Sequence, residues 1–119
     1  MATVTEAEGL AELELWQDAW DALEELPVLD RATPGALRVR LACCPALAAW
    51  DIGRQVAAIL RVGEEPDRKA AARFFHAVAL KWLSEGDRYA AGEAIKEAVK
   101  TWPDYRNEIL DHSGLSEAL

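Results

Sequence analysis

Cysteine and histidine, which often act as nucleophiles, proton carriers or metal ligands, are rare in this chain: it has two adjacent cysteines and two histidines among 119 residues. A thiol at Cys43 or Cys44 would act as a nucleophile if it were exposed and if a cation such as Arg40 stabilised its thiolate. Both cysteines instead lie in an apolar helical stretch, and a disulfide between adjacent residues would be strained. We interpret them as reduced thiols of the core.

The histidines lack the neighbours that a metal site needs. Neither His76 nor His112 has a carboxylate or thiol at a spacing that would build a ligand set on one helical face. The sequence contains no glycine-rich phosphate loop and no serine nucleophile motif. We therefore expect no metal, no cofactor and no catalysis. The alternative is a groove-based small-molecule or thiol-dependent accessory enzyme that uses Cys43, Cys44 or His76.

Composition indicates an all-α protein of one domain. Hydrophobic residues make up 51% of the chain, with many Ala and Leu, and residues typical of strands do not cluster. A chain of 119 residues fits one domain with a core of its own. It has no positively charged leader and no apolar run long enough to cross a bilayer, so we expect a cytoplasmic protein that does not bind membranes.

The net charge of -8 belongs entirely to the first quarter of the chain. Residues 1–31 carry nine acids and one base, whereas the remaining residues carry twelve of each. An acidic surface of this kind repels nucleic acid, which we exclude as a partner. A solvated acidic face explains the pattern, and a docking patch for a basic partner remains as the alternative.

Apolar spacing and helix-end signals predict the helices that must position these residues. Six are expected: residues 5–14, from about Leu15 to Leu26, 34–44, 51–62, from Asp67 to about Leu83, and from Asp87 to Trp102. Residues 5–26 could instead form one long helix, because no Gly or Pro interrupts them after Gly9. A loop is expected between Pro27 and Thr33.

Helix starts are predicted from residues that satisfy the first free amides of a helix. Thr5 with Glu8 matches a capping box, and Thr33 precedes a proline, which suits the first helical position. Asp67 and Asp87 are the expected caps of the last two helices. Gly86 between those helices should form a tight turn.

The sequence repeats at two offsets, each kept across a helical pair. A shift of 34 residues places Leu13 on Leu47 and Trp16 on Trp50. A shift of 38 residues places Leu41 on Ala79 and Gly53 on Ala91. The first offset matches the length of a helix-turn-helix repeat.

Large and small residues at fixed helical intervals between positions 75 and 103 resemble one tetratricopeptide repeat. They are Phe75, Val78, Ala79, Trp82, Gly86, Ala91, Ile95, Ala98 and Pro103. The resemblance implies a right-handed stack of about three helical hairpins over residues 5–103, followed by a short helix or tail over 104–119. Phe75 and Trp82 would pack against the small Ala79 and Ala91. The chain is similar to small bacterial proteins with few such repeats.

The second hairpin departs from the family pattern. Cys44 replaces the usual aromatic residue, and Arg40 occupies a position that is usually apolar.

The resemblance further implies a non-catalytic scaffold for protein-protein interaction. The first helix of each hairpin would line a concave groove for a protein or peptide, and Arg38, Arg73 and His76 would bind a carboxylate there. Members of the family that bind acidic peptide ends use Lys, Arg and Asn, and this chain has no Asn at a helix-lining position. Their ligands are therefore not transferred. A weak homodimer through the C-terminal edge, near Trp102 and Tyr105, is the other interaction we expect.

Overall fold

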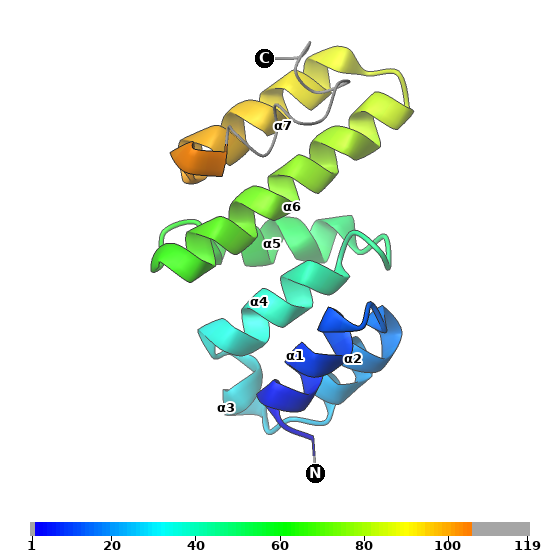
Figure 1. Cartoon of the computed structure of the whole chain (residues 1–119), viewed down its shortest axis with the longest axis vertical. Coiled ribbons are helices and arrows are strands. Elements are labelled where there is room, and N and C mark those ends of the chain that lie inside the picture. The colour runs from blue at the N-terminus through cyan, green and yellow to red at the C-terminus, as the bar shows by residue number, and fades with distance from the viewer. Residues whose placement is uncertain (1, 106–119) are drawn as a thin grey trace. The chain divides into compact units, whose positions relative to one another are not determined.

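The computed structural model describes residues 2–105, and these residues contain helices and no strand (Figure 1). The prediction of an all-α protein is confirmed for this part of the chain. Contacts divide it into two compact units, with the division between Leu60 and Arg61. Each unit is described by itself below.

The first unit contains five helices. They are α1 (Val4–Glu12), α2 (Trp16–Glu24), α3 (Val28–Arg31), α4 (Pro34–Cys43) and α5 (Trp50–Leu60). α1 pairs with α2, α4 packs against both, and α5 packs against α4. The turn between α1 and α2 excludes one long helix over residues 5–26. α3 was not predicted, because its four residues lie in the stretch expected to be a loop.

The core of the first unit is rich in alanine, which lets the helix axes approach closely. Its buried residues are Ala2, Ala7, Ala19, Ala22, Leu23, Leu26, Ala36, Val39 and Cys43. Trp16 and Trp20 are partly buried against this core. The small residues of α1, α2 and α4 therefore determine how the three helices fit together.

The second unit is a helical hairpin of α6 (Glu65–Ser84) and α7 (Arg88–Thr101), followed by the short 3-10 helix η1 (Pro103–Tyr105). α6 and α7 run side by side for most of their length (Figure 1). Ala79 and Ala91, the two small residues expected between the helices, are both fully buried. η1 packs against α7.

The large residues of this hairpin differ from the prediction. Phe75 and Trp82 are only half-buried, whereas Phe74 is 2% exposed. The guanidinium of Arg61 lies 5.3 Å from the centre of the Phe75 ring, and the Lys81 ammonium lies 4.4 Å from that of Trp82. Both rings are therefore partly exposed and border charged groups, rather than lying wholly within the core.

Two helix starts also differ from the prediction. Thr3 rather than Thr5 caps α1, because its hydroxyl accepts a hydrogen bond from the amide of Glu6 at 3.1 Å. α6 begins before Asp67, whose carboxylate instead accepts a bond from the amide of Glu64 at 3.3 Å. The predicted caps of α4 and α7, Thr33 and Asp87, are confirmed.

One helix closure occurs three times along the backbone. Its central residues, Glu14, Ala48 and Gly86, have φ angles of 61°, 55° and 81°. In each case the next residue donates its amide to a carbonyl five positions back, from Leu15 to Leu10, from Ala49 to Cys44 and from Asp87 to Trp82. Their spacings, 34 residues from 14 to 48 and 38 from 48 to 86, equal the two sequence offsets. The sequence repeat is thus accompanied by a repeat of local backbone structure.

Candidate functional site

Arg38, the first predicted partner-binding residue, lies on α4 in the first unit and is half-buried. Its Nη2 atom and the Glu8 Oε1 atom each lie 3.8 Å from the point that a Cβ on Gly35 would occupy. The guanidinium therefore lies near an acid of α1, and Arg38 already takes part in an interaction within the protein. A role in partner binding stays a prediction for this residue.

His76, on α6 in the second unit, is buried with an exposed fraction of 7%. Its Nδ1 atom lies 2.8 Å from the hydroxyl oxygen of Tyr105, within hydrogen-bond distance. The two rings meet edge to face with their centres 5.4 Å apart. Tyr105 of η1 therefore covers the imidazole that the sequence placed in an open groove.

Arg73 is exposed and lies on the same side of α6 as His76, because residues three apart share one side of a helix. Lys69, Ala77 and Leu80 also share this side at intervals of three or four residues. We call Lys69, Arg73, Ala77 and Leu80 the α6 face. Lys69 was not among the residues predicted from the sequence to bind a partner. Its position one helical turn before Arg73 is the signal that would have added it to them.

The α6 face combines charge with apolar surface. Within residues 2–105, neither Lys69 nor Arg73 makes an ion pair or a side-chain hydrogen bond. Leu80 is 42% exposed at the other end of the face. Such a surface suits a partner that offers carboxylates next to an apolar side chain.

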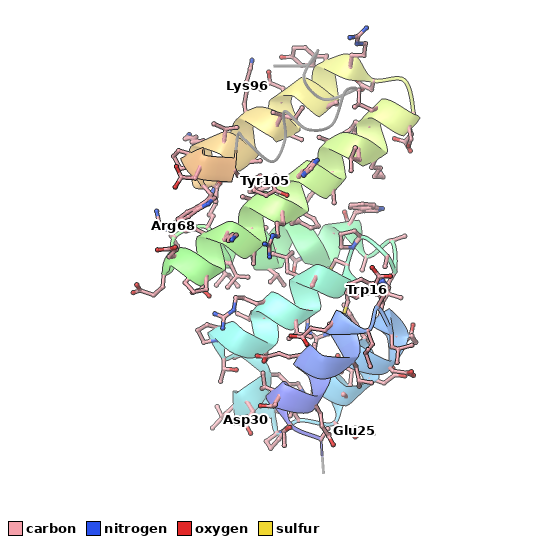
Figure 2. The ribbon with its side chains drawn as sticks, viewed as in Figure 1. Trp16, Glu25, Asp30, Arg68, Lys96 and Tyr105 are labelled. Carbon is pink, nitrogen blue, oxygen red and sulfur yellow. The ribbon has the colours of Figure 1, made fainter. Side chains whose placement is uncertain are left out.

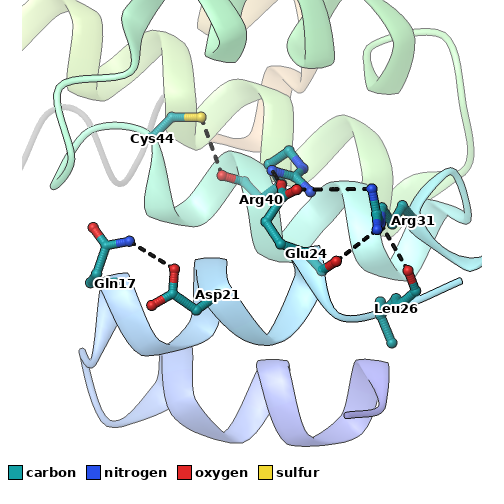
Figure 3. Close-up of polar contacts among 7 residues, drawn as sticks. All are labelled: Gln17, Asp21, Glu24, Leu26, Arg31, Arg40 and Cys44. Atoms are coloured by element: carbon teal, nitrogen blue, oxygen red, sulfur yellow. Dashed lines mark hydrogen bonds and ion pairs between the residues drawn. The ribbon is translucent and has the colours of Figure 1, made fainter. Parts of the chain in front are cut away.

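Arg40, which departs from the family pattern, has a structural role in the first unit. Its guanidinium lies 2.8 Å from a carboxylate oxygen of Glu24 and stacks 4.5 Å from the centre of the Trp20 ring. Glu24 also lies 3.9 Å from Arg31, so one carboxylate of α2 interacts with two arginines (Figure 3). Arg40 thus occupies an apolar position by burying its stem and pairing its charge.

Both cysteines are fully buried and free, as their sequence context indicates. Burial raises the pKa of the Cys43 thiol, against an opposing effect of Arg40. Burial, followed by the neighbouring Cys43, raises the pKa of Cys44 to about 11. The Cys44 thiol also donates to the carbonyl of Arg40 at 3.2 Å (Figure 3). Nucleophilic chemistry needs a thiol that is both accessible to solvent and deprotonated. The cysteines are buried and their pKa values are raised, so they meet neither condition.

Two structural features are absent from residues 2–105. No group of three or more His, Cys, Asp or Glu side chains gathers there in a way that would hold a metal ion. No helix in this part of the chain has the length and apolar character needed to cross a membrane.

No protein-family model, curated protein or solved structure matches the chain. Its function must therefore be inferred from its own residues.

Proposed function

We propose that this protein is a non-catalytic helical scaffold, similar to tetratricopeptide-repeat proteins, that binds a protein or peptide partner through the α6 face. The observation that carries the proposal is the pair Lys69 and Arg73, two cations one helical turn apart without a carboxylate partner in the described structure. A partner carboxylate would pair with them, and an apolar side chain of the partner would cover Leu80.

The architecture around this face supports a binding role. α6 is 20 residues long, and its close packing against α7 through fully buried Ala79, Ala91 and Ile95 restrains it. A rigid helix presents its side chains at little entropic cost on binding. The three matching helix closures favour a stack of hairpins, and two free thiols suit a reducing compartment such as the cytoplasm.

A co-purification experiment tests the proposal. Tagged protein from the native host is compared with Arg73→Glu and with Lys69→Glu, and each bound protein is identified by mass spectrometry. A partner that uses the α6 face is lost or reduced at least about tenfold with either variant, because reversal turns attraction into repulsion.

Lys96→Glu is the matched control, because Lys96 is an exposed cation on α7. It should retain the same partner. Retention of that partner by Arg73→Glu and Lys69→Glu, with helical circular dichroism unchanged, would exclude the α6 face as the binding surface.

A further inference from the structure

α3 is an element that buries none of its residues. Its two apolar side chains, Val28 and Leu29, are 74% and 85% exposed. A helical turn of four residues is not stable by itself, and helices in proteins normally form because an apolar face packs against the core. Something other than burial must therefore hold this turn in shape.

Polar contacts to the main chain hold α3 in place. The Arg31 side chain donates from Nε to the carbonyl of Leu26 at 2.8 Å and from Nη2 to the carbonyl of Glu24 at 2.7 Å (Figure 3). At the other end the Thr33 hydroxyl donates to the carbonyl of Asp30 at 2.9 Å. The turn is thus attached at both ends, and its apolar side chains are presented to solvent in a fixed arrangement.

The charges beside α3 define what could cover it. Glu25 lies just before the turn and Asp30 lies within it, and Figure 2 shows both at the end of the first unit where α2 ends and α3 begins. Neither carboxylate makes an ion pair within residues 2–105, whereas Glu24 is paired with Arg31 and Arg40. Residues 1–31 as a whole carry nine acids and one base.

This charge decides between the possible occupants. A second copy of the chain that docked through this same surface would bring acids against acids, and nucleic acids and anionic membranes would also be repelled. A basic surface would be attracted, and it would need an apolar centre to cover Val28 and Leu29.

We propose that α3 is a docking site for a basic amphipathic helix of a partner protein. The apolar side of that helix covers Val28 and Leu29, and its Lys or Arg side chains pair with Glu25 and Asp30. This site is independent of the α6 face, because it belongs to the other unit and selects a partner of opposite charge. Failure of one proposal leaves the other intact.

An NMR titration of the uniformly labelled full chain tests the site. The probe is a synthetic helical peptide of about 18 residues, built from Leu and Lys so that one side is apolar and the other basic. We expect amide shifts concentrated at residues 25–32. The double variant Val28→Ser with Leu29→Ser should weaken binding about tenfold or more, because both anchors are lost. Its spectrum also reports that the fold is intact.

Two further variants separate apolar anchoring from general charge attraction. Leu13→Ser is the matched control, because Leu13 is 71% exposed among acids of the same unit but lies outside α3. It should change the affinity less than about twofold, since it removes no anchor. Glu25→Gln with Asp30→Asn should weaken binding and reduce its dependence on salt.

Three results would overturn the proposal. The first is an equal loss of affinity with Leu13→Ser. The second is the same set of shifts with polylysine, which would show attraction by charge alone. The third is a set of concentration-dependent shifts at residues 25–32 without peptide, which would identify a second copy of the chain as the occupant.

Discussion

Burial determines the chemistry of the side chains that first suggested catalysis. Cys43 and Cys44 are inaccessible, and the cation next to them, Arg40, is directed to Glu24. Its effect on the pKa of Cys44 is smaller than that of desolvation, so the pKa rises rather than falls. His76 is likewise placed against Tyr105 and not in an open site.

The first prediction concerns thiol reactivity. In the native protein at neutral pH, a thiol-specific reagent should modify neither cysteine until denaturant is added, because both thiols are buried and protonated. The release of coloured product over time measures the rate. Rapid modification of one cysteine in the folded protein would restore the thiol-dependent alternative.

The second prediction concerns stability at high pH. The pKa of Cys44 is raised from 9.0 to about 11, so the folded state keeps a proton that the unfolded state has already lost between these values. The free energy of unfolding should therefore fall as the pH rises from 9.0 towards 11. In Cys44→Ala this fall should be smaller. Urea unfolding of both proteins at about pH 7 and about pH 10 measures it, and equal falls would contradict the assignment.

The third prediction concerns the pair of His76 and Tyr105. Tyr105→Phe keeps the ring against the imidazole but removes the hydroxyl from its hydrogen bond. The free energy of unfolding should decrease by about 1 kcal/mol, as expected for a lost buried hydrogen bond. Urea unfolding measures the change. Tyr89→Phe is the control, because Tyr89 is 80% exposed and its hydroxyl should contribute little.

Among the helices and their connections, one structure recurs: the helix closure at Glu14, Ala48 and Gly86. A positive φ strains any residue with a Cβ, and only the third closure uses glycine. The same turn is therefore relaxed after α6 and strained at the two earlier positions. Three helix starts also share one feature, because the side-chain oxygens of Thr3, Thr33 and Asp87 each accept an amide hydrogen bond. The local sequence differs at each of these starts.

The fourth prediction follows from this difference. Ala48→Gly should raise the free energy of unfolding and Gly86→Ala should lower it, each by about 1 kcal/mol, because one change removes strain and the other adds it. Thermal or urea unfolding of the two variants measures both signs. A loss of stability in Ala48→Gly would show that the positive φ at that position is not a source of strain.

The uneven charge is the main property of the molecule as a whole. The acids of residues 1–31 repel one another, and only some of them are compensated by nearby cations such as Arg31 and Arg40. This self-repulsion lowers stability at low salt and opposes self-association through the acidic surface. The predicted homodimer would use the C-terminal edge of the second unit instead, where Tyr105 is buried and Arg68 lies 5.3 Å from the Trp102 ring.

The fifth prediction tests this repulsion. Glu12→Gln with Glu25→Gln should raise the free energy of unfolding at low salt, since both acids lie at helix C-termini, where negative charge is least favourable. The gain should shrink as salt is added. Urea unfolding at low and high salt measures it. Glu93→Gln should give no gain, because it removes the partner of Lys96.

Local signals made most of the helices predictable. Apolar spacing, Thr33 before a proline and Gly86 act on neighbouring residues, so the sequence by itself determined where most of the helices form. α3 was not predicted because its shape depends on two hydrogen bonds to residues outside it. Arg31 donates them to the carbonyl of Glu24 in α2 and to the carbonyl of Leu26, which follows α2. Nothing in the four residues themselves indicates a helix.

The tertiary structure alone decided which charged and aromatic side chains remain available. Phe74 and Phe75 are adjacent in sequence, and only helix packing decides which of them is buried. His76 meets Tyr105 across 29 positions, and Arg61 meets Glu97 across 36. Partners so distant in sequence leave no local signal, because a helix period places residues on a face without specifying what covers that face.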